Sequence, residues 1–220
     1  MNEVVVRPLR FTDKVSAMRG FLETLGLRSR VESDRGVWID MVAGHVMFAL
    51  HDAATSATGG KAGDTRLAFE ADDIDELRER LDAAGYEDAT VFDEAFGRVL
   101  SVTGPEGHQI WIDERSKDLY GYKLHDAHPD ARWSVTPVLG VADQAGWERF
   151  LDTLGGDNPE LVRFEDGAAA ELEVRLELTT TESLGEVAER LTATGYGPSE
   201  KTAGWLSVVD PDGQIVRVRG

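Results

Sequence analysis

The sequence repeats itself, and this repeat limits the folds open to the chain more than any other feature. The segment Glu79–Tyr86 matches Glu189–Tyr196, with Glu-Arg-Leu followed by Gly-Tyr in both copies. The segment Leu100–Gly107 matches Leu206–Gly213, because both read Leu-Ser-Val and end in Pro-acid-Gly. These matches lie 110 and 106 residues apart, and within the first half Gly44-His45 to Phe48 echoes Gly107-His108 to Trp111. A supersecondary unit of about 55–60 residues has therefore been duplicated more than once. We therefore expect four related modules arranged as two halves.

Each module is predicted to contain a strand, a helix and further strands. Runs of β-branched and apolar residues predict strands, and apolar residues at helical spacing that stop at a glycine predict helices. The third module is short, because little sequence separates Gly155 from the next strand, so one or two strands are expected to be missing there. The predicted strands cover 4–11, 27–33, 36–42, 45–51, 65–71, 88–93, 97–103, 109–113, 135–141, 172–179, 204–209 and 214–219. Three predicted helices are capped by Thr12 or Asp13, by Asp72 or Asp73, and by Asp143, and a fourth covers 183–194.

The repeat predicts two domains. The first spans 1–115 with two complete modules, and a second, shortened domain of the same fold spans 133–220. Between them, 116–132 has no clear period and is interpreted as a linker. Arg7 and Arg10 are unusual on a first strand, and we expect them to anchor the interface between the halves.

The composition narrows the classes of partner. The net charge is -18, from 41 acidic and 23 basic residues, which repels nucleic acid and anionic membranes. No stretch approaches the roughly 18 apolar residues of a membrane span. There is no cysteine, so disulfides and thiolate metal sites are excluded. The chain begins without the basic and apolar regions of a signal peptide, so a cytoplasmic protein is expected.

The order of these elements resembles a known superfamily. The diagnostic parts are a helix ending in Leu-Gly, three strands, the strand Leu67–Asp73 and the terminal turn Asp210–Gly213. Together they resemble the vicinal-oxygen-chelate superfamily, which includes glyoxalase I, bleomycin-resistance proteins and extradiol dioxygenases. The resemblance implies an α+β fold of tandem βαβββ modules, whose curled mixed sheets form half-barrels with the helices outside and the ligand on the concave face.

Active members of that superfamily hold a divalent metal through a His or Gln on a first strand and a Glu on a last strand. Arginine stays protonated and repels a cation, and apolar side chains offer no ligand. The resemblance therefore implies that no metal or other cofactor is bound at these positions. Carried over one at a time, they fall on Val6 (or Arg7), Phe48, Arg66, Trp111, Thr136, Leu176 and Arg217.

Strand alternation predicts which side chains line the concave face. The aromatic residues could stack on a planar or cationic ligand or simply fill the barrel. Arg66 could pair with a ligand carboxylate or with Glu70. The candidate ligand-binding residues are Trp38, Asp40, Phe48, Arg66, Glu70, Trp111 and Asp113.

The function expected from these residues is metal-free binding or sequestration of a small molecule that is aromatic or cationic, an antibiotic being one candidate. The alternative is a metal-dependent lyase or dioxygenase of the same superfamily, with a displaced metal site around His51 or His45. Neither reading requires nucleic acid or a membrane, and both a monomer and a homodimer are compatible with the sequence.

Overall fold

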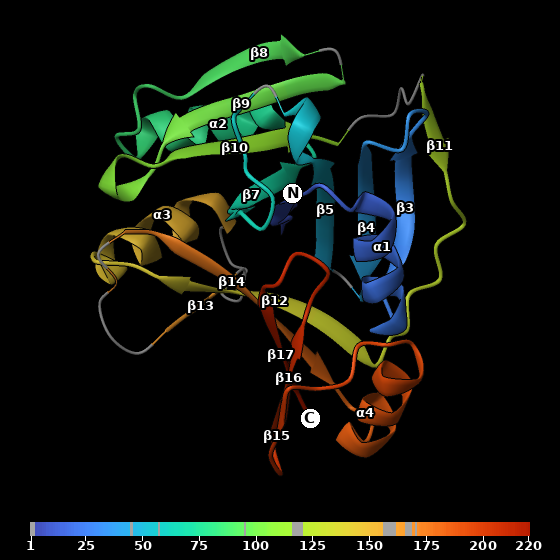
Figure 1. The fold of residues 1–220 in the computed structure, drawn as a ribbon. Helices are drawn as coiled ribbons and strands as arrows, with labels where there is room; N and C mark the ends of the chain where they lie inside the picture. Colours follow the sequence, from blue (N-terminus) through green and yellow to red (C-terminus); the bar gives the residue numbers. More distant parts are fainter. Residues whose placement is uncertain are drawn as a thin grey trace. The chain divides into compact units, whose positions relative to one another are not determined.

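The chain forms two compact units in the computed structural model (Figure 1). The first unit comprises Met1–Arg7, Leu67–Tyr120 and Pro137–Val174, and the second comprises Pro8–Arg66, Gly121–Thr136 and Arg175–Gly220. Each unit therefore combines a module of the first half with a module of the second half, whereas the predicted boundaries follow the repeat. The structure describes residues 3–44, 46–56, 58–94, 96–115, 121–155, 162–165, 169 and 171–220.

The first unit contains a five-stranded sheet with the order β1-β7-β10-β9-β8. The two strands β7 and β10 are parallel, and the other neighbours in this sheet are antiparallel. Its elements are β1 (Val4–Val6), β7 (Ala68–Ala71), α2 (Ile74–Ala83), β8 (Thr90–Glu94), β9 (Gly97–Thr103), the short 3-10 helix η2 (Pro105–Gly107), β10 (Gln109–Glu114) and α3 (Gln144–Gly155).

The second unit contains a six-stranded sheet with the order β11-β3-β4-β5-β2-β6. Its edge strand β11 lies within the segment predicted to be a linker, and it pairs with β3. The elements of this part are β2 (Leu9–Thr12), α1 (Val15–Thr24), β3 (Arg28–Ser33), β4 (Trp38–Ala43), β5 (Val46–Asp52), the 3-10 helix η1 (Ala53–Thr55), β6 (Thr65–Arg66), β11 (Tyr122–Leu124) and α4 (Leu184–Ala193).

A third sheet has the order β13-β12-β14-β17-β16-β15. Between α3 and β14, the described residues 162–165, 169 and 171–172 form β13. The strands are β12 (Trp133–Gly140), β13 (Arg163–Phe164), β14 (Glu173–Thr180), β15 (Glu200–Lys201), β16 (Trp205–Val209) and β17 (Ile215–Arg219). The α+β class and the βαβββ modules expected from the sequence are thus confirmed.

The first predicted strand, 4–11, is in fact two strands that separate at Pro8. Proline has no N–H group, so it cannot continue a ladder of hydrogen bonds. Before it, β1 pairs with β7 in the first unit, and after it β2 pairs with β5 in the second. The prediction of one continuous strand was wrong, because it followed β-branched composition and ignored the missing donor.

The helix caps follow the sequence in part. The side chain of Asp73 accepts a hydrogen bond from the Glu76 N–H, and Ser183 accepts one from the Gly185 N–H. The N-cap of α1 is Lys14, which makes no capping bond with its side chain. The hydroxyl of Thr12 accepts from the Lys14 N–H at 3.0 Å in the turn before the helix, so neither Thr12 nor Asp13 is the N-cap of α1.

Each unit has its own apolar core. In the second unit α1 and α4 pack against the sheet strands, and Trp133 is fully buried among them. Gly26, at φ +88, ends α1, and a β-carbon there would lie 2.7 Å from the Trp133 ring. Phe69, Trp147 and Phe150 are the largest buried side chains of the first unit. In the part of the chain that the structure describes, no helix is both long enough and apolar enough to span a membrane.

An arginine joins the paired helices of each unit. In the first unit Arg80 of α2 donates to the carbonyl of Leu154, at the end of α3, at 2.6 Å. In the second unit Arg190 of α4 donates to the carbonyl of Thr24, at the end of α1, at 2.8 Å. Arg80 and Arg190 occupy the same position in the repeat, and the last carbonyls of a helix have no partner within it. Each unit therefore contains an equivalent arginine–carbonyl contact between its two helices.

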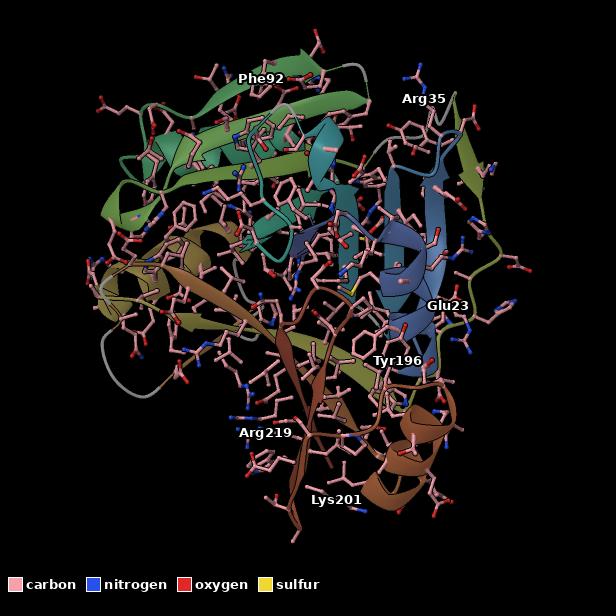
Figure 2. All side chains as sticks on the ribbon, in the orientation of Figure 1. Glu23, Arg35, Phe92, Tyr196, Lys201 and Arg219 are labelled. Carbon is pink, nitrogen blue, oxygen red and sulfur yellow. The ribbon has the colours of Figure 1, made fainter. Side chains whose placement is uncertain are left out.

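Aromatic contacts between the paired helices also match between the two units. Tyr86, which follows α2, meets Phe150 of α3 edge-on with ring centroids 5.1 Å apart. Tyr196, which follows α4, meets Phe21 of α1 edge-on at 5.0 Å, and Figure 2 shows it beside α1. These matched tyrosines confirm that the repeat seen in the sequence is a repeat of contacts.

The acidic residue of the Pro-acid-Gly turn makes a third matched contact. Glu106, held at φ +58, accepts from the Ala142 N–H and from the indole of Trp147 at 2.7 Å. Asp212 accepts from the hydroxyl of Thr12 at 2.8 Å. Each turn therefore binds at the beginning of the helix that its module packs against.

We expect Arg190→Met to lower the free energy of unfolding by about 1–3 kcal/mol, because it leaves buried acceptors without their donor. Besides the Thr24 carbonyl, Arg190 binds both oxygens of Glu182 and holds the pKa of this buried carboxyl below its ordinary range. Urea denaturation measures the loss. The control Arg78→Met, at an exposed position of α2, should change stability by less than about 0.5 kcal/mol. Equal losses in the two variants would contradict the role given to Arg190.

Candidate ligand-binding site

Three of the predicted residues come together on one face of the first unit's sheet. Ile110 and Ile112 of β10 are buried, and they alternate with Trp111 and Asp113, which are half-buried. In register, Asp113 lies opposite Glu70. Trp111 and Asp113 therefore lie on the face of β10 opposite the buried Ile110 and Ile112. We call the side chains of Glu70, Phe92, Trp111 and Asp113, with Arg7, the Trp111 face.

An aromatic pair forms the apolar part of the Trp111 face. Phe92 of β8, labelled in Figure 2, meets Trp111 edge-on with ring centroids 5.8 Å apart. Both rings are half-buried, so each retains surface that can contact a ligand. The sequence analysis did not single out Phe92. Phe92 lies within the predicted strand 88–93, and the same alternation argument applied to this strand would have identified it.

Ion pairs neutralise the polar part of the same face. The guanidinium of Arg7 contacts Glu70 at 3.4 Å and also binds Asp113. Arg115 binds the other oxygen of Glu70 at 2.7 Å and Asp72 at 2.6 Å. Glu70 is buried, whereas the side chain of Asp113 keeps 21% of its surface exposed. Of the two carboxylates that Arg7 binds, Asp113 is therefore the more accessible to a ligand.

Arg7 and Arg10 were both expected to join the halves of the chain, and they behave differently. Arg10 forms a buried ion pair with Asp210, 200 residues away, at 2.5 Å, as expected. Arg7 binds Glu70 and Asp113, which both belong to the first half. Its role is to compensate carboxylates within one sheet.

The remaining predicted residues, Trp38, Asp40, Phe48 and Arg66, lie in the second unit. Asp40 is completely buried and binds the guanidinium of Arg30, whose Nε lies 2.9 Å away. Trp38 meets Tyr122 of β11 edge-on at 5.9 Å. Their strand neighbour Ile39 is in the core with α1, so both side chains point to the opposite face of β4.

Phe48 lies in the core beside Met18 and Phe21 of α1, so its predicted place on the concave face was wrong. The matching of Phe48 with Trp111 followed the Gly-His pair before each strand. The parallel pairings differ by one residue: Ala49 lies opposite Leu9, as Trp111 lies opposite Ala68. A slip of one residue moves every side chain of a strand to the other face.

Arg66 is an exposed residue held by a loop. It donates to the hydroxyl of Thr58 at 2.9 Å and to the Thr58 carbonyl at 3.0 Å, and it lies over the ring of Phe11 at 4.9 Å. Gly60 of the same loop packs directly on Phe11, because a β-carbon there would lie 2.3 Å from the ring. The contacts of Arg66 thus fasten this loop over Phe11.

The described residues do not fit a divalent metal. They contain no group of three His, Asp or Glu side chains placed to hold an ion, and His45 lies outside the described residues. On the Trp111 face, the cation between Glu70 and Asp113 is the guanidinium of Arg7. The Nδ1 of His51 lies 2.8 Å from the Asp52 carbonyl, and its ring packs against Phe11. We therefore derive no chemical step that passes through a metal.

Comparison with known proteins establishes the fold. No protein-family model matches the sequence. No curated protein matches it. Among solved structures, a catechol 2,3-dioxygenase is 13% identical with a TM-score of 0.62, over 100% of this chain and 88% of that one. The Mn(II)-bound glyoxalase from Novosphingobium aromaticivorans is 18% identical with a TM-score of 0.59, over 99% of this chain and 82% of that one.

A third match is a variant of homoprotocatechuate 2,3-dioxygenase from B. fuscum in complex with HPCA. It is 14% identical with a TM-score of 0.59, over 98% of this chain and 70% of that one. All three similarities extend over almost the whole chain. The fold expected from the resemblance to the vicinal-oxygen-chelate superfamily is thereby confirmed.

We expect Arg7→Met to destabilise the chain by about 3–5 kcal/mol, because it leaves the buried Glu70 and its neighbour Asp113 with a missing counter-charge. Thermal and urea denaturation measure the change. The control is Arg98→Met, which breaks the more exposed pairs with Asp75 and Glu114 and should cost less than about 1 kcal/mol. If Arg7→Met lowered the free energy of unfolding by no more than its control, the ion pairs of Arg7 would not stabilise the sheet.

Proposed function

We propose that this chain, which has the fold of the vicinal-oxygen-chelate superfamily, binds a small aromatic molecule on the Trp111 face without the help of a metal. The observation that carries the proposal is the half-buried Trp111–Phe92 pair beside a partly exposed carboxylate, Asp113. The rings offer apolar and stacking contact, and the carboxylate accepts hydrogen bonds. The function is binding or sequestration.

The charges of the Trp111 face define the polar group of the ligand. Arg7 and Arg115 already neutralise Glu70, so a ligand meets no uncompensated charge there. Asp113 accepts from Arg7 and retains exposed surface. A ligand with a hydroxyl or ammonium donor next to its ring would satisfy this carboxylate. A ligand carboxylate would be repelled by it.

The similar structures supply a suitable probe. Their names refer to catechol and homoprotocatechuate, which are aromatic rings with hydroxyl groups. Catechol has the donor chemistry that Asp113 requires and the size of ring that Trp111 and Phe92 can contact. It serves as a test ligand, and the natural ligand belongs to the same chemical class in this proposal.

We expect catechol to bind Trp111→Leu about tenfold more weakly than the unaltered chain, because the variant loses the stacking surface and the burial of one large ring. Isothermal titration calorimetry measures the affinity, and the indole N–H signal of Trp111 in ¹H–¹⁵N spectra locates the ligand. Tyr122→Leu, which removes the edge-on partner of Trp38 in the other unit, is the control and should bind normally. Failure of the unaltered chain to bind catechol, or full affinity in Trp111→Leu, would contradict the proposal.

The alternative is a metal-dependent lyase or dioxygenase with an ion near His51, and the Mn(II)-bound glyoxalase among the similar structures favours it. Metal content separates the two functions. We expect protein purified without a chelator to contain much less than one divalent ion per chain, with no change in His51→Ala. A stoichiometric ion that is lost in His51→Ala would support the alternative and overturn the metal-free function.

A further inference from the structure

We propose that the second unit carries a separate ligand site, which binds the carboxylate of a small planar aromatic acid. The site is the face of β17 and β16 that points away from α4. We call it the Arg217 face. It does not rest on the function proposed for the first unit, and its residues are Trp205, Ser207, Val209, Ile215, Arg217 and Arg219.

Strand alternation separates this face from the core. Leu206 and Val208 of β16, with Val216 and Val218 of β17, are buried in the core that includes residues of α4. The side chains between them therefore point the other way. In register, Ser207 lies opposite Arg217, and Trp205 lies opposite Arg219. The indole and the two guanidinium groups thus share one face of the sheet, and the buried Ser207 lies between them.

Arg217 is the group that would bind the ligand. It is exposed, and its guanidinium lies over the ring of Trp205, 4.9 Å from the centroid. Within the described part of the chain it makes no ion pair, although the sequence has 41 acidic residues and 23 basic ones. A guanidinium stacked on an indole keeps N–H donors at its edge, where they can bind both oxygens of a carboxylate.

The second arginine of the face is already compensated. Arg219, labelled in Figure 2, pairs with the buried Glu177 of β14 at 2.7 Å. Glu177 also lies opposite Arg217 in register, and Glu200 of β15 lies opposite Ser207. Arg219 is therefore occupied by Glu177, and Arg217 is the arginine of this face that is left to a ligand.

Apolar surface next to Arg217 would hold the ring of the acid. Val209 and Ile215 are paired across β16 and β17, and they keep 43% and 64% of their surfaces exposed. With Trp205 they place apolar contact on both sides of Arg217 along the strands. A planar acid can therefore direct its carboxylate to Arg217 and its ring to apolar side chains.

The residue at the position of Arg217 differs between the two copies of the repeat. Trp111 lies opposite Ser101, and Arg217 lies opposite Ser207, which matches Ser101 in the repeat. One copy thus has an indole and the other a guanidinium at the equivalent place on the last strand. The Trp111 face has an accessible carboxylate and the Arg217 face an accessible cation, so the two faces favour ligands of different charge.

Benzoate is the probe for this site. We expect benzoate to shift the indole N–H signal of Trp205 in ¹H–¹⁵N spectra, assigned with Trp205→Phe. In Arg217→Gln the affinity should fall at least about tenfold, because a charge-assisted bidentate pair is lost. The control Arg78→Gln removes the same charge from an exposed position of α2, and it should leave the affinity unchanged.

Two further ligands test separately the contributions of the carboxylate charge and of the aromatic ring. Benzamide keeps the ring without the charge, and cyclohexanecarboxylate keeps the charge without the aromatic ring; both should bind more weakly than benzoate. Equal binding of benzamide, an unmoved Trp205 signal or full affinity in Arg217→Gln would overturn the proposal. Trp111→Leu should bind benzoate normally, so this site and the Trp111 face can fail independently.

Discussion

The contact on which each unit depends joins an arginine of one module to the end of a helix in another. A helix leaves its last carbonyls without partners, and its dipole favours a positive charge at that end. Arg80 supplies this charge to α3 and Arg190 supplies it to α1. Because both arginines occupy the same position of the repeat, the same contact at a helix end forms in both units.

This pairing of helices accounts for the presence of α3 in the third module. Between α3 and β14 the described residues form a single strand, yet α3 itself is complete and carries Phe150 and the Leu154 carbonyl. Those groups are the ones that α2 and Tyr86 contact. The helix of the third module is therefore part of the core of the first unit.

The duplicated frame holds different chemistry in its copies. Trp111 and Arg217 occupy equivalent places opposite matched serines, and each lies on a sheet whose other side is closed by apolar residues. The backbone ladder accepts either side chain, because only the opposite face is constrained by the core. This freedom is the physical basis for two ligand chemistries on one kind of sheet.

Much of the fold could be predicted from the sequence, because it depends on local patterns. Alternation in β10 correctly separated Trp111 and Asp113 from the core, and Asp73, one of the two predicted caps of α2, is its N-cap. The short edge strands β11, β13 and β15 carry no such pattern and were missed.

The sequence by itself determined the repeat, the α+β class and the absence of ligating side chains at the expected metal positions, because these depend on residue identity and periodicity. Only the tertiary structure decided which modules share a core, which strand register places Phe48 inside, and which carboxylates Arg7 and Arg10 neutralise. These features depend on contacts between residues far apart in the chain. A one-residue difference in strand register, which the repeat does not reveal, was enough to reverse the predicted face of β5.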